Sequence, residues 1–132
     1  MKRLVLMLLL CAPLSACRPP EAASGAGSVQ NPPGVRVSLE LPNPPAVGPA
    51  EVLVYVLDGS EGVSEAQVTV TGNMTHAGME PVIAEAQELE PGLYSVPDFD
   101  LNMAGDWLLT AEVTLPDGAR ASADRPISVP GG

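Results

Sequence analysis

The chain has 132 residues and a formal net charge of −10, with six basic side chains against 16 acidic ones. So acidic a chain offers no basic surface for contacts with phosphate groups, and we therefore expect no binding to nucleic acid. Its length allows for one domain of ordinary size after any leader is removed.

The N-terminus has the features of an export signal. Lys2 and Arg3 precede an apolar run over residues 4–10, which is too short to span a bilayer. The sequence Leu14-Ser15-Ala16-Cys17 then follows the pattern of a bacterial lipoprotein signal. It predicts a signal peptide over residues 1–16, cleavage before Cys17 and lipid on that thiol, which would anchor the protein to a membrane. The alternative is an ordinary secretory peptide with a chance cysteine.

Cleavage at Cys17 would leave four arginines, no lysine and 16 acidic residues, a formal charge of −12. The other cysteine, Cys11, would leave with the signal, so the folded domain would have no disulfide, no thiolate nucleophile and no cysteine-based zinc site. Residues 17–34 are rich in Pro, Gly, Ala and Ser, a composition that predicts a flexible tether after the lipidated cysteine. The domain itself would occupy residues 35–132.

Short runs with alternating apolar side chains, separated by turn residues, continue to the end of the chain. Asp117-Gly118 between two such runs is a strong hairpin signal, and no helical pattern follows the leader. The runs predict an all-β, immunoglobulin-like β-sandwich of about seven antiparallel strands without a disulfide. The expected strands lie at 35–41, 51–57, 66–71, 81–87, 93–96, 107–115 and 119–129.

The residues with the most specific chemistry lie in two short segments. The stretch Gly72-Asn73-Met74-Thr75-His76-Ala77-Gly78-Met79 contains the only histidine, and Met103-Ala104-Gly105-Asp106-Trp107 contains the only tryptophan. Outside the leader, every methionine falls in these two segments. Soft thioether donors with one imidazole favour Cu(I) over other common metals, and a site with at most one nitrogen and no thiolate is poor for zinc.

Strand parity indicates how these donors could meet. Continuing the inward set of residues 66, 68 and 70 by twos places Met74 and His76 on the core face, and Ala77-Gly78 would turn Met79 back. By the same count Met103 shares a face with Phe99 and Leu101. Two strand ends would then converge at one pole of the sandwich, with Cu(I) held by Met74, His76, Met79 and Met103. The alternatives are methionines that fill gaps in the core and a loop histidine bonded to a backbone carbonyl.

We expect no enzymatic activity and no small-molecule substrate. The sequence has no Gly-rich phosphate loop, nucleophile elbow or zinc motif. Asp98, Asp100 and Asp106 lie near expected turns, where aspartate is common, although a hydrolase built from carboxylates is the remaining alternative. Trp107 is predicted to be a core anchor with its indole N–H on a backbone acceptor, or alternatively a cation–π shield for bound Cu(I).

The two methionine segments, with Pro81-Val82 and Gly92-Leu93-Tyr94 between them, resemble the YtkA-like family over about residues 47–115. Members are small exported Ig-like domains, related to FixH-type proteins that take part in building respiratory oxidases. The resemblance implies an Ig-like fold and a role in copper handling or oxidase assembly.

Two functions of different classes follow. The first is a Cu(I) chaperone or buffer, lipid-anchored on the extracytoplasmic (periplasmic) side of a membrane, with a copper-accepting membrane protein as its partner. The second is an interaction module without metal, which would steady a membrane complex through a sheet face or an edge strand.

Overall fold

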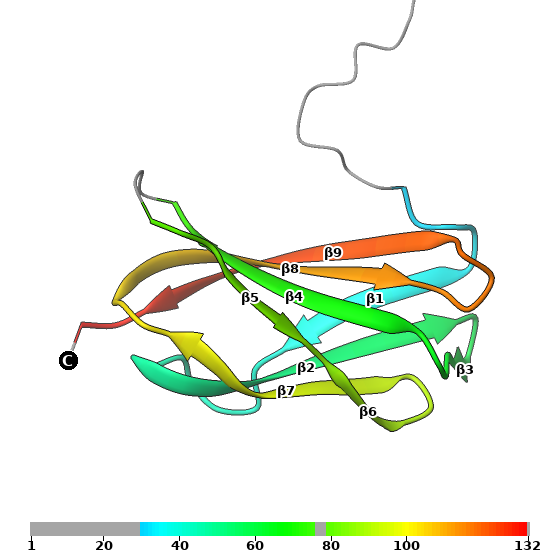
Figure 1. The fold of residues 1–132 in the computed structure, drawn as a ribbon, viewed down its shortest axis with the longest axis horizontal. Coiled ribbons are helices and arrows are strands. Elements are labelled where there is room, and N and C mark those ends of the chain that lie inside the picture. The colour runs from blue at the N-terminus through cyan, green and yellow to red at the C-terminus, as the bar shows by residue number, and fades with distance from the viewer. Residues whose placement is uncertain (1–29, 76–78, 132) are drawn as a thin grey trace, which may run out of the picture.

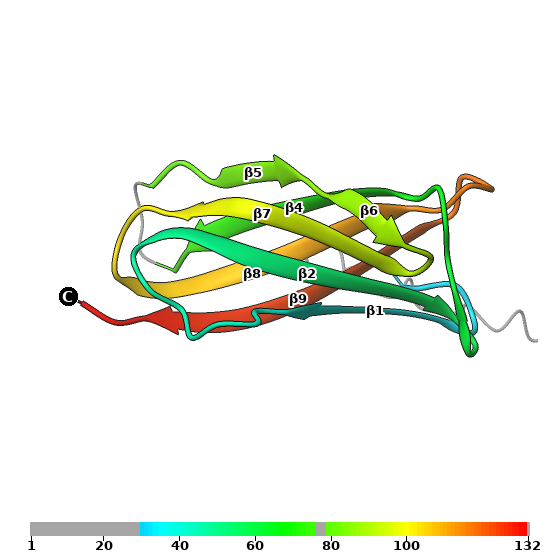
Figure 2. The same cartoon turned by 90° about the horizontal axis from the view of Figure 1, so that it is seen from below.

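The computed structural model describes residues 30–75 and 79–131. These residues form nine β-strands and no helix, arranged as two antiparallel sheets that pack face to face (Figures 1 and 2). The predicted all-β sandwich is therefore confirmed, and the described residues contain no cysteine. No helix among the described residues is long and apolar enough to cross a membrane. The predicted signal peptide, residues 1–16, Cys17 and most of the predicted tether lie outside the described residues.

The first sheet has the order β1-β2-β7-β6, with the two-residue strand β3 paired to β2. The second sheet has the order β5-β4-β8-β9. The strands of the first sheet are β1 (Val35–Glu40), β2 (Gly48–Asp58), β3 (Glu61–Gly62), β6 (Gln87–Glu90) and β7 (Leu93–Leu101). Those of the second are β4 (Gln67–Met74), β5 (Val82–Glu85), β8 (Gly105–Thr114) and β9 (Arg120–Val129).

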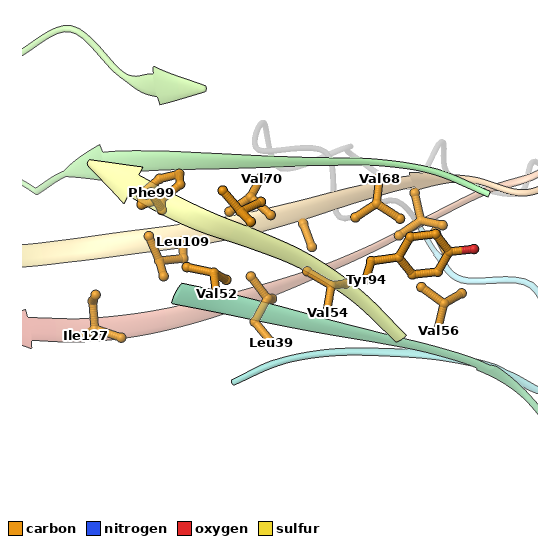
Figure 3. Close-up of a cluster of buried hydrophobic side chains, with 14 of the residues drawn as sticks. Leu39, Val52, Val54, Val56, Val68, Val70, Tyr94, Phe99, Leu109 and Ile127 are labelled. Atoms are coloured by element: carbon orange, nitrogen blue, oxygen red, sulfur yellow. The ribbon is translucent and has the colours of Figure 1, made fainter. Parts of the chain in front are cut away.

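The core lies between the sheets and is built from the alternating residues that the sequence pattern indicates. Each strand turns every second side chain inward, so an apolar residue at that spacing is removed from water and stabilises the sandwich. Side chains from both sheets meet in this layer (Figure 3). Its central members are Val52, Val54 and Val56 on β2, Val68 and Val70 on β4, Tyr94, Phe99 and Leu101 on β7, and Trp107, Leu109, Ala111 and Val113 on β8.

Segment 81–87 differs from its prediction as one short strand. The chain pairs with β4 over Val82–Glu85 and then passes to the other sheet, where Gln87–Glu90 pairs with β7. Ala86 lies at the crossing, and its N–H donates to the carbonyl of Val68 at 2.9 Å. This crossing, together with β3, accounts for nine strands in place of about seven.

The two poles of the sandwich hold different residues. Val35, where β1 begins, pairs with Asp58 at one pole, which also carries the Asp117-Gly118 turn between β8 and β9. The opposite pole carries the turn over residues 102–104 between β7 and β8 and the ends of β4 and β5 next to it (Figure 1). We call it the methionine pole, because Met74, Met79 and Met103 belong to these segments.

A buried tyrosine fixes the chain far from the methionine pole. The hydroxyl of Tyr94 donates to the carbonyl of Val63 at 2.7 Å and accepts from the N–H of Ala66 at 3.1 Å. Glu88 Oε1 lies 3.3 Å from the same hydroxyl. Burial is the main cause that raises the pKa of Tyr94 above its ordinary value of 10.0, and the negative charge of Glu88 adds to it. The phenol thus ties the segment before β4 to β7.

Candidate metal centre

Met74 is the last residue of β4 and lies at the border of the core. Its strand partner is Trp107 on β8, and its half-buried side chain packs against the core cluster. The terminal methyl of Met74 reaches under Gly105, where a Cβ would come within 2.8 Å of Met74 Cε. Gly105 has φ +136, a conformation that side-chain-bearing residues rarely adopt. Glycine therefore allows both this backbone turn and the close approach of Met74.

The turn that carries Met103 is held in place by Trp107. The indole N–H of Trp107 donates to the backbone carbonyl of Met103 at 3.0 Å, and the ring itself is buried. The prediction of a core anchor with a backbone acceptor is confirmed. One residue earlier, the carbonyl of Asp106 accepts from the N–H of Thr75 at 3.1 Å. The β4–β8 ladder thus continues past Met74 and joins the two methionine segments.

The structure brings Met74 and the turn of Met103 together, and it leaves two thioethers open to solvent. The side chain of Met103 is 45% exposed, and that of Met79 is 39% exposed. Met79 leads into β5, whose Val82 pairs with Gly72 two residues before Met74. His76 lies outside the described residues, so its place in a ligand set stays a prediction.

The expected alternation of buried and exposed residues continues to the end of β4, but on β7 it ends before Met103. Val68, Val70 and Gly72 are buried and Met74 is half-buried on the same face. Strand β7 stops at Leu101, however, and the chain turns away before Met103. Met103 therefore does not share the buried face of Phe99 and Leu101. The period of two applies only while the backbone stays extended, and the residue at position 103 is already in the turn.

Carboxylates do not gather at the methionine pole. Within residues 30–75 and 79–131, no group of three or more His, Cys, Asp or Glu side chains is placed to hold a metal ion. Glu80, next to Met79, is exposed, and Asp106, three residues after Met103, accepts a hydrogen bond from the hydroxyl of Ser128 at 2.7 Å. The candidate donors among the described residues are the sulfur atoms of Met74, Met79 and Met103.

The fold and this pole define an antiparallel β-sandwich domain with thioether side chains gathered at one end. The chain belongs to the YtkA-like family, whose pattern matches residues 30–112. This match confirms the resemblance and includes both methionine segments.

No curated protein matches the chain. Among solved structures, a superoxide reductase (neelaredoxin) from Ignicoccus hospitalis is similar to it at 17% identity and a TM-score of 0.47. The similarity covers 71% of this chain and 79% of that one. A likeness this distant says nothing about activity.

Proposed function

We propose that this protein is a membrane-anchored, extracytoplasmic Cu(I)-binding domain that acts as a chaperone or buffer in the setting of respiratory oxidase assembly. The observation that carries the proposal is the joining of Met74 to the Met103 turn, through the Gly105 contact and the Thr75–Asp106 bond. Thioether sulfur binds Cu(I) without losing a proton and is a soft donor that suits this ion. His76 and Met79 would complete the set from the loop between β4 and β5.

The exposure of the donors supports transfer by ligand exchange. Met74 is half-buried and held by its packing, whereas Met79 and Met103 are open to solvent. A partner's donors can approach the two exposed sulfurs first, displace them one at a time, and leave Met74 as the last ligand. No electron needs to move, because the ion stays Cu(I) throughout.

The anchor belongs to the same proposal. Lipid on Cys17 would keep the domain at the outer side of a membrane, within reach of a copper-accepting membrane protein. Outside the cytoplasm thiols tend to become oxidised or paired, so a thioether and imidazole site retains its affinity there.

Equilibrium Cu(I) binding to purified protein spanning residues 18–132, against a graded series of competing chelators, tests the proposal. We expect one Cu(I) per chain, weaker retention in Met74→Leu and in His76→Ala, and weaker binding of Zn(II) than of Cu(I). Met74→Leu conserves volume, so its cost to stability should stay below about 1.5 kcal/mol. The matched control is Leu89→Ala, which removes an exposed apolar side chain on β6 and should leave Cu(I) retention unchanged. Failure of the unaltered protein to hold Cu(I) against a weak chelator would refute the proposal.

A second candidate is an interaction module without metal, and the outer face of the first sheet favours it. Leu53, Tyr55 and Leu57 alternate along the outward side of β2 and are half-buried, and Leu93 lies across from Tyr55. The outer face of the second sheet instead carries threonines at the matching central positions, including Thr69, Thr71 and Thr110. If the protein is a module of this kind, it does not retain Cu(I), and replacing Met74 and His76 should change only its stability.

A further inference from the structure

Strand β5 is an unpaired edge that lies directly beside the methionine pole. It is the terminal strand of the second sheet and pairs only with β4 among the described residues. Met79 precedes it by three residues. Figure 2 shows β5 along one border of the sandwich.

The hydrogen-bond pattern fixes which backbone groups of β5 are free. In an antiparallel pair, alternate residues bond to the neighbouring strand, and the residues between them turn their N–H and C=O groups the other way. Ala86 donates to Val68 on the β4 side, so residues of the same parity on β5 also face β4. Thr75 bonds to Asp106 of β8, which sets the opposite parity of β4 toward β8 and agrees with this assignment. The backbone groups of Ile83 and Glu85 therefore face away from the sheet.

The side chains of this edge add an apolar contact and negative charge. Ile83 is 64% exposed on the outer face of the second sheet. Glu80 and Glu85 flank it, and both are exposed. An exposed β-branched residue on a free edge is the arrangement by which sheets accept an added strand.

We propose that β5 is the docking edge for a partner protein, which adds an extended segment with a basic residue on either side of an apolar one. Backbone bonds to Ile83 and Glu85 would hold the segment, and its basic side chains would face Glu80 and Glu85. That the partner is the Cu(I) acceptor rests on the proposed function, since a strand on β5 would end beside Met79. The docking edge itself rests on the geometry of β5 and on the charges of Glu80 and Glu85, and needs no copper.

Charge argues against two other occupants. A second copy of this chain, paired antiparallel about Ile83, would bring Glu80 of one copy near Glu85 of the other. A bilayer rich in anionic headgroups would also be repelled by these carboxylates. A basic protein segment gains from the same charges, because exposed carboxylates attract and orient cationic partners.

Site-specific photo-crosslinking of the full chain in its native cell envelope tests the edge. The photoreactive residue replaces Glu85, and the matched control replaces Glu112. Both glutamates are exposed and both lie opposite Thr69, one on the edge strand and one on the interior strand β8. We expect an adduct with another protein at position 85 and none above background at position 112.

Two substitutions at Ile83 separate docking from mere proximity. Ile83→Pro removes a free N–H without breaking a β4–β5 bond, since proline is tolerated on an edge strand whose N–H faces solvent. It should lower the adduct yield at position 85 at least about fivefold, the factor for one lost backbone hydrogen bond. Ile83→Thr keeps that N–H and should retain more of the adduct than Ile83→Pro. Urea unfolding of each variant checks that the domain is intact.

The outcomes are distinct. The proposal would be overturned by equal adducts at both positions, by no adduct, or by an adduct whose yield Ile83→Pro does not change. It would also be overturned if the adduct joins lipid or a second copy of this chain. Cu(I) retention by purified Ile83→Pro should equal that of the unaltered chain. A specific adduct in a protein that holds no Cu(I) would leave the docking edge standing and refute the copper function.

Discussion

Replacing Gly105 by alanine should both strain the methionine pole and push against Met74. The backbone at Gly105 has φ +136, and a new Cβ would lie 2.8 Å from Met74 Cε. Real Cβ atoms do not approach a carbon this closely, so the Met74 side chain has to move. The same substitution therefore tests the contact on which the candidate site depends.

The expected loss has two parts of different origin. A side chain at a backbone conformation reserved for glycine costs about 1–3 kcal/mol. The atom in the way is the end of the flexible, half-buried Met74 side chain, so moving it adds only about 0.5–1.5 kcal/mol, the cost of turning one side-chain torsion away from its preferred rotamer. Gly105→Ala should then lower the free energy of unfolding by about 1.5–4.5 kcal/mol. Gly118→Ala is the matched control for backbone strain, because Gly118 has φ +88 and no atom lies within 4 Å of its Cβ position.

A double-mutant cycle with Met74→Ala isolates the contact. Urea unfolding, followed by the fluorescence of the buried Trp107, gives the free energy for each variant. In the Met74→Ala background the contact part should vanish, which leaves a coupling of about 0.5–1.5 kcal/mol between positions 74 and 105. Met74→Ala paired with Gly118→Ala should give no coupling. Additive losses at positions 74 and 105 would refute the packing of Met74 under Gly105.

Three further outcomes are expected. Tyr94→Phe should lower the free energy of unfolding by about 1–3 kcal/mol, because Val63 and Ala66 lose their partner. Because the pKa of Tyr94 is raised in the folded state, this stabilisation should be complete below pH 10 and fade as the pH rises through the folded pKa. The difference in the free energy of unfolding between the unaltered protein and Tyr94→Phe should therefore become smaller in alkali. Cu(I) affinity should fall in acid around pH 6.5, roughly the ordinary pKa of an imidazole, because protonated His76 cannot bind the ion. This fall should be absent in His76→Met. A pH dependence that survives the substitution would exclude His76 as the titrating ligand. Cys17→Ser should leave the protein unanchored or uncleaved, and a mass spectrum with an unmodified N-terminus elsewhere would contradict lipidation.

The strands with strong alternation were predictable from the sequence, because their side chains decide the fold. On β8 every second residue from Trp107 to Val113 is apolar and buried, so one period and one face suffice to place the strand. The indole partner of Trp107 was also predictable in kind, since a buried N–H needs an acceptor.

The crossing between β5 and β6 could not be predicted in the same way. Its inward residues, Val82, Ala84 and Ala86, are small and only half-buried, so the pattern does not show at which residue the chain changes sheets. Glu88 is exposed, and its carboxylate accepts the N–H of Glu65 and contacts the hydroxyl of Tyr94. Those contacts are set by a tertiary approach that local spacing does not encode.

At the candidate site, the alternation of inward and outward residues correctly predicted that Met74 lies on the inner face, because β4 stays extended to its end. The same count was wrong for Met103, because β7 ends before that residue. The only feature of the sequence that relates to the contact between Met74 and Gly105 is the glycine two residues before the buried Trp107. Glycine at a strand start indicates a turn or a close approach, but the sequence does not say which side chain makes that approach.

The placement of the two poles limits how an anchored domain could present its methionines. The chain enters the sandwich at Val35, at the pole opposite Met103, and the ten residues of β8 span about 33 Å between the poles. The bond from Ser122 N–H to Asn31 at 2.7 Å fixes the chain to β9 just before that entry.

Residues 18–29 can extend at most about 40 Å. A domain anchored through Cys17 and standing upright would therefore hold its methionines well above the membrane, and one lying flat on the membrane would bring them close to it. An acceptor whose site lies near the bilayer thus requires the flat orientation, and an edge strand such as β5, which lies along the side of the sandwich next to the methionine pole, is suited to hold it.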